Sequence, residues 1–401
     1  MTFLSRAREA LIRRSFRRIA DQLAAADAET LLAGTELRVL RVFREAAKTV
    51  PKYRALLERA RTSPEKIVSL EGFREHVPVI DKRTWFDSDL RDVCTGGTLN
   101  GIASFYSSSG QTGFFSYGGE TRQEQKQAAL SLEFSLQQAF HVLDRKTLLI
   151  NCLPMGVRVH TRSLSLAETS VREDVVWSLL RKLGKEFDQF ILLGEHPFLK
   201  HVVEGGSEQP APIDWKALCI QVITGGEYIA ENFRSYLASQ LGLNVEEKGA
   251  GSILVNYGLS ELSVSIANEN WHTVQIRRFA HTDTRFRQAL CGSDDAFCPT
   301  VMQYYPTQVY LETLPSSGTR QELIATMLDL DRRIPMIRYN TGDCALLVTH
   351  AKMVTLLRDF GRADLIPPLA LPAVLIWGKS NGLPTAEGTV SWLKTSCIFL
   401  Q

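Results

Sequence analysis

The sequence lacks three features that would each have decided its class: a Cys-x-x-Cys pair, a long apolar run and a strong net charge. Its 401 residues carry 46 basic and 44 acidic side chains, which leaves a formal net charge of +2. That balance gives no general attraction to nucleic acid or to an anionic membrane. No apolar run reaches the length of a membrane-spanning helix. The seven dispersed cysteines indicate reduced thiols in a cytoplasmic protein rather than a disulfide framework.

The length predicts two or more subdomains, and the composition, 44% hydrophobic and 22% charged, is typical of a globular protein. Residues 5–25 are rich in arginine, as a transit peptide would be. Acidic Glu9 and Asp21 interrupt them, and apolar residues such as Leu11 and Phe16 recur with a helical period. The pattern therefore favours a basic surface helix, or a helix that docks on a partner.

Residues 1–75 predict helices, with a break at Pro51. From about residue 103, short apolar runs alternate with amphipathic stretches, which predicts a largely parallel sheet covered on both faces. Strands are predicted in ASFYSS, KTLLINCL, QFILLG, LCIQVITGG and GSILVNYG, and helices over 120–140, 171–184 and 228–241. In such sheets, ligands bind at the carboxyl ends of the strands.

Beyond about residue 265 the pattern is richer in strand signals. We predict an antiparallel or barrel-like subdomain there, with strands in WHTVQIRRFA, VMQYYPTQVYLE, RQELIATML and CALLVTH. Residues 203–213 predict a polar loop.

The loop SSSGQTG follows the apolar run ASFY and precedes a predicted helix. Its glycines allow several backbone N–H groups to converge on one anion, and its hydroxyls add neutral donors. It is not a P-loop, because no Lys-Ser/Thr pair follows the second glycine. A solvated turn explains the residue types equally well. The predicted phosphate-binding residues are Ser107, Ser108, Ser109, Gly110, Gln111, Thr112 and Gly113.

The loop VITGGEYI ends a predicted strand in Gly225, Gly226 and Glu227. Paired glycines let the backbone approach a flat ring closely. The alternative is an ordinary strand-to-helix turn, with Glu227 in the first turn of the helix.

The loop VNYGLSEL ends another predicted strand in Tyr257 and Gly258, followed by Ser260 and Glu261. A tyrosine ring can stack on a base, a hydroxyl can contact a phosphate and a carboxylate can bind Mg²⁺. The alternative is a turn whose tyrosine belongs to the core.

The loop RYNTGD ends in Asp343, which can accept hydrogen bonds from sugar hydroxyls. The alternative is an Asx turn. Four such loops in this order, three of them at strand ends of one predicted sheet, indicate a single site.

The motifs SSSGQTG, GGE, NYGLSE and YNTGD resemble, in order, the nucleotide-site motifs of the adenylate-forming enzymes, which include the acyl- and aryl-CoA ligases. Residues 50–85, YGLSELSVSIANENWH and IPMIRYNTGD are similar to the phenylacetate–CoA ligase branch. The resemblance covers about residues 37–345 and continues weakly to 391. It implies the large domain of an adenylate-forming enzyme: mostly parallel sheets flanked by helices, plus a β-rich, barrel-like subdomain.

The resemblance also implies roles for residues. Residues 107–113 would wrap the pyrophosphate of ATP, Thr112, Ser260 and Glu261 would be catalytic, and Glu261 would bind Mg²⁺. The adenine and ribose would contact Gly225, Gly226, Glu227, Tyr257, Gly258, Asp343 and Lys379.

The acyl pocket is expected near NCLPMGVRVHT, with Met155, Gly156 and His160 as its wall. A histidine after a strand is more often structural than catalytic.

The implied organisation is a helical N-terminal segment (1–100), an α/β nucleotide-binding core (101–265), a β-rich subdomain (266–375) and a hinge with a remnant of a C-terminal domain (376–401).

The implied activity uses ATP and Mg²⁺ to convert a carboxylic acid, expected to be aromatic, into an acyl-adenylate. The acyl group then passes to the thiol of coenzyme A (CoA) or of the phosphopantetheine on an acyl carrier protein. The resemblance leaves a homodimer open. Alternatives are an ATP-independent acyltransferase from acyl-CoA to a carrier protein, an acyl-protein synthetase-like enzyme, and a non-catalytic nucleotide-binding relative.

The sequence departs from the family pattern in several places. The loop at 107–113 continues into Phe114 and Phe115, and Gln111 replaces a common threonine. No motif for the family's C-terminal lysine is recognisable after the predicted hinge, where Lys379 replaces a typical arginine. The residues around Cys397 do not match the acyl-protein synthetase motif. The spacing of His272, His281, Cys291 and Cys298 fits no compact zinc pattern.

Overall fold

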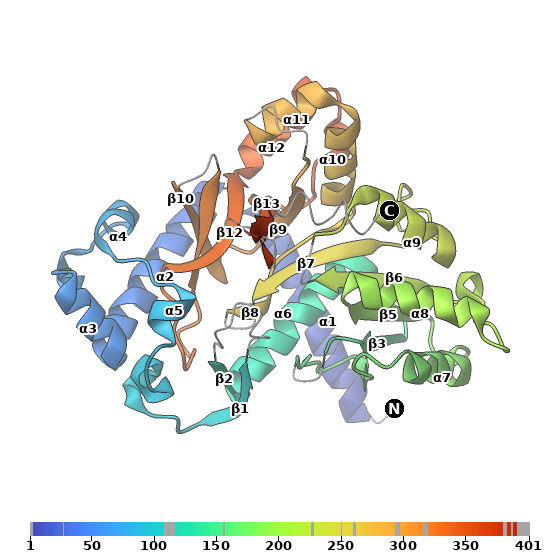
Figure 1. Ribbon diagram of the computed structural model, residues 1–401, viewed down its shortest axis with the longest axis horizontal. Helices are drawn as coiled ribbons and strands as arrows, with labels where there is room; N and C mark the ends of the chain where they lie inside the picture. Colours follow the sequence, from blue (N-terminus) through green and yellow to red (C-terminus); the bar gives the residue numbers. More distant parts are fainter. Residues whose placement is uncertain are drawn as a thin grey trace.

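An eleven-stranded mixed sheet organises the chain, in the order β10-β11-β12-β13-β9-β8-β7-β6-β5-β3-β4 (Figure 1). This computed structural model describes residues 3–26, 28–107, 117–154, 157–225, 228–249, 251–259, 262–292, 297–315, 320–379, 383–385 and 388–390. None of the helices in these ranges is both long and apolar enough to cross a bilayer.

The first half of the sheet is parallel from β4 to β7. Its strands are β3 (Thr147–Asn151), β4 (Ser165–Glu168), β5 (Gln189–Gly194), β6 (Ile220–Gly225) and β7 (Ile253–Leu259). The parallel strands predicted in KTLLINCL, QFILLG, LCIQVITGG and GSILVNYG are therefore confirmed, whereas ASFYSS forms β1 (Ile102–Ser107) of a separate antiparallel hairpin. Nearly every residue of β3, β5 and β6 is buried, as expected when helices cover both faces.

Each face of the parallel half has its own helices. Leu149, Ile191 and Ile223 pack with α1 (Phe3–Ala25) and α6 (Arg122–Phe140). The residues that alternate with them face α7 (Glu173–Leu183), α8 (His196–Glu208) and α9 (Glu231–Leu241). Of these helices, α6, α7 and α9 confirm the three predicted over 120–140, 171–184 and 228–241.

The second half of the sheet is antiparallel and continues the first without a break in pairing. Its strands are β8 (Ser263–Asn268), β9 (Thr300–Tyr304), β10 (Val309–Pro315), β11 (Gln321–Met327), β12 (Tyr339–Val348) and β13 (Ala373–Lys379). The predicted fold class is confirmed, and the C-terminal strands extend the same sheet. A short ribbon of β14 (Leu383–Thr385) and β15 (Gly388–Val390) follows.

The N-terminal region is helical, as predicted. It contains α1, α2 (Ala28–Thr49), α3 (Pro51–Arg59), α4 (Leu70–His76) and α5 (Lys82–Trp85). Pro51 begins α3, because its missing N–H is not needed at the first position of a helix.

Two local predictions were wrong. WHTVQIRRFA is not a strand but α10 (Trp271–Thr282), which a reciprocal Asn270–Thr273 capping box begins. The buried Thr273, Ile276 and Ala280 recur three and four residues apart, which is the helical period. Two further helices lie in this region, α11 (Thr284–Cys291) and α12 (His350–Asp359).

The second wrong prediction was the polar loop at 203–213, because α8 extends to Glu208. Two glycines in its last turns looked like a loop signal. A Cβ on Gly206 would lie 2.5 Å from the ring of Trp215, so this helix position is small because an indole packs against it.

The loop at 107–113 does not lead from a strand straight into a helix. A separate antiparallel hairpin, β1 (Ile102–Ser107) and β2 (Tyr117–Thr121), flanks it, and α6 begins after β2 with a Thr121–Glu124 capping box. The hairpin is a two-stranded sheet of its own.

Gly118 in β2 packs directly against the ring of Tyr106. A Cβ added at this position would lie 1.9 Å from that ring, so there is no room for a side chain. We expect Gly118→Ala to lower the free energy of unfolding by about 1–3 kcal/mol, since the ring must move. Urea unfolding measures the change. Gly34→Ala in α2 is the control, because nothing lies within 4 Å of its Cβ and an exposed helical alanine should stabilise by about 0.5–1 kcal/mol. A Gly118→Ala protein as stable as the parent would contradict the close packing.

Candidate functional site

A tyrosine, an aspartate and a lysine that lie far apart in the sequence meet at one carboxylate oxygen. The Tyr257 hydroxyl donates to Asp343 Oδ2 over 2.7 Å, and Lys379 Nζ donates to the same oxygen over 3.0 Å. Asp343 is buried, with 4% of its surface exposed, whereas Lys379 is exposed. The prediction that Tyr257 and Asp343 lie together is confirmed, and Lys379 joins them.

The strands explain why these residues meet. Asp343 on β12 is paired directly with Lys379 on antiparallel β13. Lys379 also donates to the Thr341 carbonyl over 3.0 Å, which fixes its ammonium group beside the carboxylate.

The turn before Asp343 is held by its own side chains. The Gly342 N–H donates to Asn340 Oδ1 over 2.8 Å, which is the Asx bond that the sequence offered as an alternative. Gly342 has φ +72°, a conformation that favours glycine. The Asx turn and the contacts of Tyr257 and Lys379 with Asp343 are therefore both present. The turn directly precedes Asp343 and fixes the backbone there.

Arg338 anchors the start of β12, and sequence analysis missed it. Its guanidinium makes a two-bond ion pair with buried Glu312, at 2.8 and 3.2 Å. It also donates to the carbonyls of Arg74 and Val77, at the end of α4. Arg338 thus ties the N-terminal helices to the strand that carries Asp343. The sequence held one hint of this buried pair, because Arg338 stands between the apolar side chains of Ile337 and Tyr339, both of which are buried.

The strand that carries Tyr257 rests on a buried ionic network. Glu269 Oε2 accepts from the Val255 N–H over 2.8 Å, two residues before Tyr257. The guanidinium of Arg234 lies 2.9 Å from the same carboxylate, and Arg277 lies near it. Burial raises the pKa of Glu269, and the two guanidinium groups oppose that rise. Sequence analysis missed this network, because its members come from three separate elements.

Gly225 and Gly258, two of the predicted adenine contacts, lie on neighbouring strands. Gly225 ends β6 and is paired with Asn256 of β7, so it lies beside the strand of Tyr257. Gly258 follows Tyr257 in β7. Ser107 ends β1 on an exposed face.

His160 lies between β3 and β4 and contacts Glu120 of β2. Sequence analysis singled out His160 but missed Glu120, which is encoded 40 residues earlier.

Twelve predicted site residues lie outside the described ranges. These are Ser108, Ser109, Gly110, Gln111, Thr112, Gly113, Met155, Gly156, Gly226, Glu227, Ser260 and Glu261. They remain predictions.

Within the described ranges, no three histidine, cysteine, aspartate or glutamate side chains gather as a metal site. His272 instead contacts Lys248 and the Leu365 carbonyl. Glu261, the predicted Mg²⁺ ligand, is among the residues that the structure does not describe.

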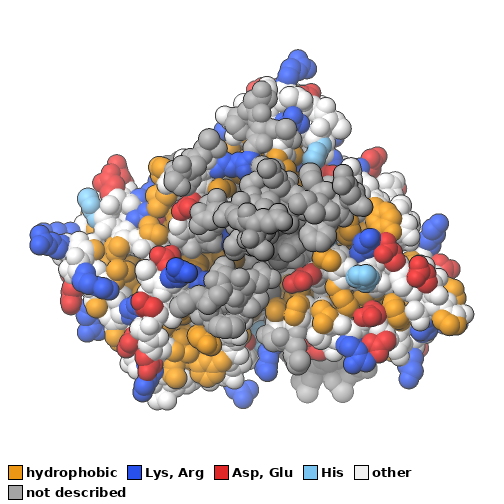
Figure 2. All heavy atoms as spheres, viewed as in Figure 1, with side chains coloured by type: hydrophobic (Ala, Val, Ile, Leu, Met, Phe, Trp, Pro, Cys, Tyr) orange, Lys and Arg blue, Asp and Glu red, His pale blue; other side chains and the backbone are white. Residues whose placement is uncertain are grey.

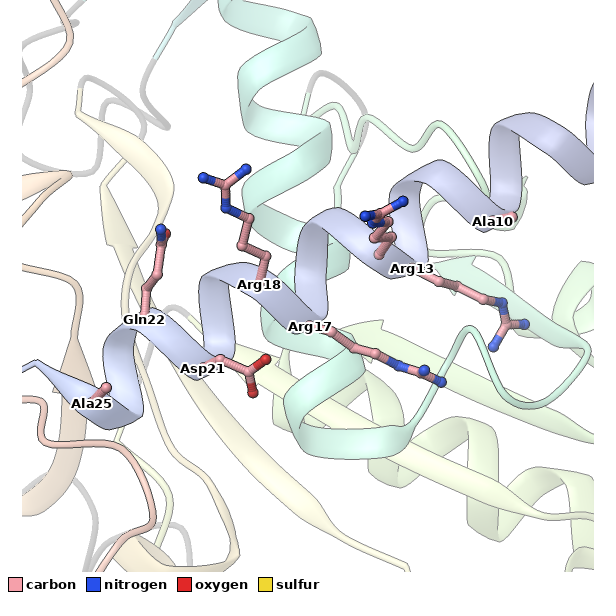
Figure 3. Close-up of a pocket in the computed structure, with 8 residues that line it drawn as sticks. Ala10, Arg13, Arg17, Arg18, Asp21, Gln22 and Ala25 are labelled. Carbon is pink, nitrogen blue, oxygen red and sulfur yellow. The ribbon is translucent and has the colours of Figure 1, made fainter.

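The basic N-terminal segment is a helix, as predicted, and a groove of about 870 Å³ runs along it (Figure 3). Arg13 pairs with Asp144 at 2.6 Å, in the loop between α6 and β3. The residues that line the groove are Ala10, Arg13, Arg14, Arg17, Arg18, Asp21, Gln22 and Ala25. On the face of the molecule in Figure 2, by contrast, basic and acidic side chains are interspersed. A docking role for α1 stays a prediction.

No protein-family model matches this sequence, and no curated protein matches it. Solved structures do match. A 2-hydroxyisobutyryl-CoA ligase in an open conformation, in complex with 2-HIB-AMP and CoA, aligns with a TM-score of 0.64 and 15% identity over 90% of this chain and 77% of that chain. The same ligase in the thioesterification state, again with 2-HIB-AMP and CoA, gives a TM-score of 0.63 and 16% identity over 88% and 68%.

These alignments concern the fold. The chain has the fold of the large domain of adenylate-forming ligases, which confirms the resemblance at that level. The phenylacetate–CoA ligase branch stays a prediction.

Proposed function

We propose that this chain, which has the fold of an adenylate-forming ligase, activates an aromatic carboxylic acid with ATP and passes the acyl group to a thiol. The acceptor in this proposal is CoA or the phosphopantetheine of a carrier protein. The observation that carries the proposal is the meeting of Tyr257, Asp343 and Lys379 on one oxygen.

The cluster suits a ribose. Tyr257 and Lys379 both donate to Oδ2 of Asp343, so the carboxylate is oriented before a ligand arrives. A carboxylate oxygen accepts strongly from hydroxyl groups, and a preoriented acceptor loses little freedom on binding. The ring of Tyr257 adds a flat apolar surface for the base.

The first chemical step is displacement of pyrophosphate from the α-phosphorus by the carboxylate of the acid. Such steps depend mainly on positioning and on neutralising developing negative charge. Mg²⁺, when bound, supplies part of that neutralisation. Lys379 places a positive charge beside the ribose subsite, and the glycines at 225 and 258 leave room for the purine.

The test is acid-dependent exchange of labelled pyrophosphate into ATP, with a panel of aryl and aliphatic acids. We expect exchange with at least one aryl acid, and its loss in Glu261→Ala. If no acid supports exchange by the parent chain, the proposed activation step is wrong. Acylation of CoA or a carrier from acyl-CoA without ATP would instead favour the transferase alternative.

Tyr257→Phe isolates one hydrogen bond of the cluster. It removes the hydroxyl but keeps the ring. We expect KM for ATP to rise about 3- to 10-fold, because this hydroxyl orients Asp343 rather than binding the ribose itself, and one typical hydrogen bond contributes about 0.5–1.5 kcal/mol. Tyr236→Phe is the control, because this half-exposed hydroxyl on α9 contacts Glu204, away from the cluster. A larger KM for the control than for Tyr257→Phe would argue against the cluster as the ribose subsite.

A further inference from the structure

An imidazole and a carboxylate form a close pair at the base of the β1–β2 hairpin. His160 Nε2 lies 2.8 Å from Glu120 Oε1, with 23% and 17% of the two side chains exposed. Glu120 is in β2 and His160 is in the segment between β3 and β4. The pair therefore forms only in the folded chain. Both side chains are mostly buried, but each keeps part of its surface exposed to solvent.

The carboxylate of this pair is itself held. Ser104 Oγ donates to Glu120 Oε1 over 2.8 Å, and Gln125 Nε2 donates to it over 3.1 Å. Ser104 stands opposite Glu120 in the hairpin, so the register of β1 and β2 sets the first contact. Burial raises the pKa of Glu120, but the hydrogen bonds from His160 and Ser104 outweigh it and leave the pKa below its usual value. Glu120 is therefore a carboxylate near neutral pH.

An ionised carboxylate only accepts hydrogen bonds, so Nε2 of His160 carries the proton of the contact. In the neutral imidazole, Nδ1 is then the basic nitrogen. The carboxylate of Glu120 thus favours the tautomer of His160 with its proton on Nε2. Catalytic sites with a nucleophile and a base often use a third group in the same way, to orient the base.

The backbone around His160 is pinned on both sides. Before it, Asn151 Nδ2 donates to the Val157 carbonyl over 3.1 Å. After it, the N–H groups of Arg162 and Ser163 donate to one oxygen of Glu133, a fully buried carboxylate of α6. A segment without regular secondary structure is thereby fixed by buried side chains, which preorganises the imidazole.

The pair lies at the edge of the sheet where the candidate site lies. β3, β5, β6 and β7 are parallel, so the segment after β3 leaves the sheet at the same edge as the one after β6. The hairpin that holds Glu120 also carries the predicted phosphate loop, and Figure 1 shows it at the end of the molecule toward which β7 points.

We propose that Nδ1 of His160 is the general base that takes the proton of the acceptor thiol, with Glu120 holding the imidazole in place. The inference rests on the proposed function. In this step the S–H proton passes to Nδ1, the sulfur attacks the acyl carbonyl carbon, and the bond from that carbon to the AMP oxygen breaks. AMP leaves with the electron pair of the broken bond, and the thioester forms with no oxidant or reductant.

The first experiment separates the two half-reactions of His160→Asn. We expect thioester formation from pre-formed acyl-adenylate to fall about a hundredfold, the lower end of the usual range for a general base. Pyrophosphate exchange should fall by less than about tenfold, because the imidazole also borders the predicted acyl pocket. His201→Asn is the matched control, since His201 is exposed on α8. Equal losses in both half-reactions, or no loss in either, would overturn the assignment.

The second experiment follows pH. Protonation at Nδ1 removes the base, so the thioester rate of the parent should fall at acidic pH, and His160→Asn should lose this acidic limb. Glu120 of β2 and Glu133 of α6 contact this segment, and Glu168 of β4 contacts Asn151 at the end of β3, before it. The segment itself carries Arg158 and Arg162. An acidic limb that persists in His160→Asn would reject His160 as the base.

A third readout does not require turnover. Nitrogen NMR of the labelled imidazole should show the proton on Nε2 in the parent. In Glu120→Gln, which loses the charged acceptor, the share of this tautomer should fall. Failure of pyrophosphate exchange in the parent would defeat the proposed function while leaving this result intact. An unchanged tautomer population in Glu120→Gln would reject the role of Glu120 in holding the imidazole, whatever the exchange assay shows.

Discussion

Asp343→Ala is expected to lower kcat/KM for ATP in acid-dependent exchange by about 10²- to 10⁴-fold. Asp343 would accept hydrogen bonds from two ribose hydroxyls, and bonds to a charged group contribute about 1.5–3 kcal/mol each. The variant also leaves Tyr257 and Lys379 without their shared acceptor. Initial rates of exchange over a range of ATP concentrations measure the effect, which should appear mainly as a higher KM.

Two variants make this result specific. Asp359→Ala removes an exposed carboxylate at the end of α12 and should leave the kinetics unchanged. Asp343→Asn keeps the shape but not the charge, so it should fall between the parent and the alanine variant. Thermal unfolding of each protein shows that it is folded. If Asp343→Ala retains ATP kinetics within threefold of the parent, Asp343 does not bind the ribose.

Arg338→Met is expected to lower the free energy of unfolding by about 3–5 kcal/mol, because it leaves the buried Glu312 without its cation. Glu312 is only 5% exposed, so water cannot replace the guanidinium. The carbonyls of Arg74 and Val77 lose their donor as well. Urea unfolding at neutral pH measures the loss. Reduced affinity for ATP should accompany it, because Arg338 directly precedes the strand that carries Asp343.

The same substitution in an exposed pair is the control. Arg172 pairs with Asp174 at 2.7 Å on the surface, and Arg172→Met should not change the unfolding midpoint measurably. Combining Arg338→Met with Glu312→Leu removes both charges, and the double variant should recover part of the lost stability. If Arg338→Met alone is as stable as the parent, this ion pair does not hold the N-terminal helices to the sheet.

The sequence predicted the fold class and most of the parallel strands, because fully buried strands leave continuous apolar runs such as LLI in β3 and FILL in β5. It failed where the local pattern was ambiguous. The stretch at 271–280 alternates apolar and polar residues briefly, and only the capping box at Asn270 and the burial of Ile276 and Ala280 show a helix. Gly206 looked like a loop residue, because the partner that demands its small size, Trp215, comes from a different element.

The sequence also predicted three members of the candidate site that the structure describes together: Tyr257, Asp343 and Lys379. Each ends a strand or lies in a turn motif with polar residues, which is a local signal. Arg338, Glu120 and the network around Glu269 carry no such signal. A charged residue amid apolar neighbours gives only a hint, and its partner cannot be read until the chain is folded.

By itself, the sequence determined the fold class, most strands and helices of the parallel half, and which loops are candidates for binding, because hydrophobic period and turn chemistry are local properties. Only the tertiary structure decided which charges pair. It set Asp343 against Tyr257 and Lys379, and Glu120 against His160, through sheet order and strand register. Hydrogen bonds act over about 3 Å, and only the folded chain brings residues 40 or 86 positions apart within that distance.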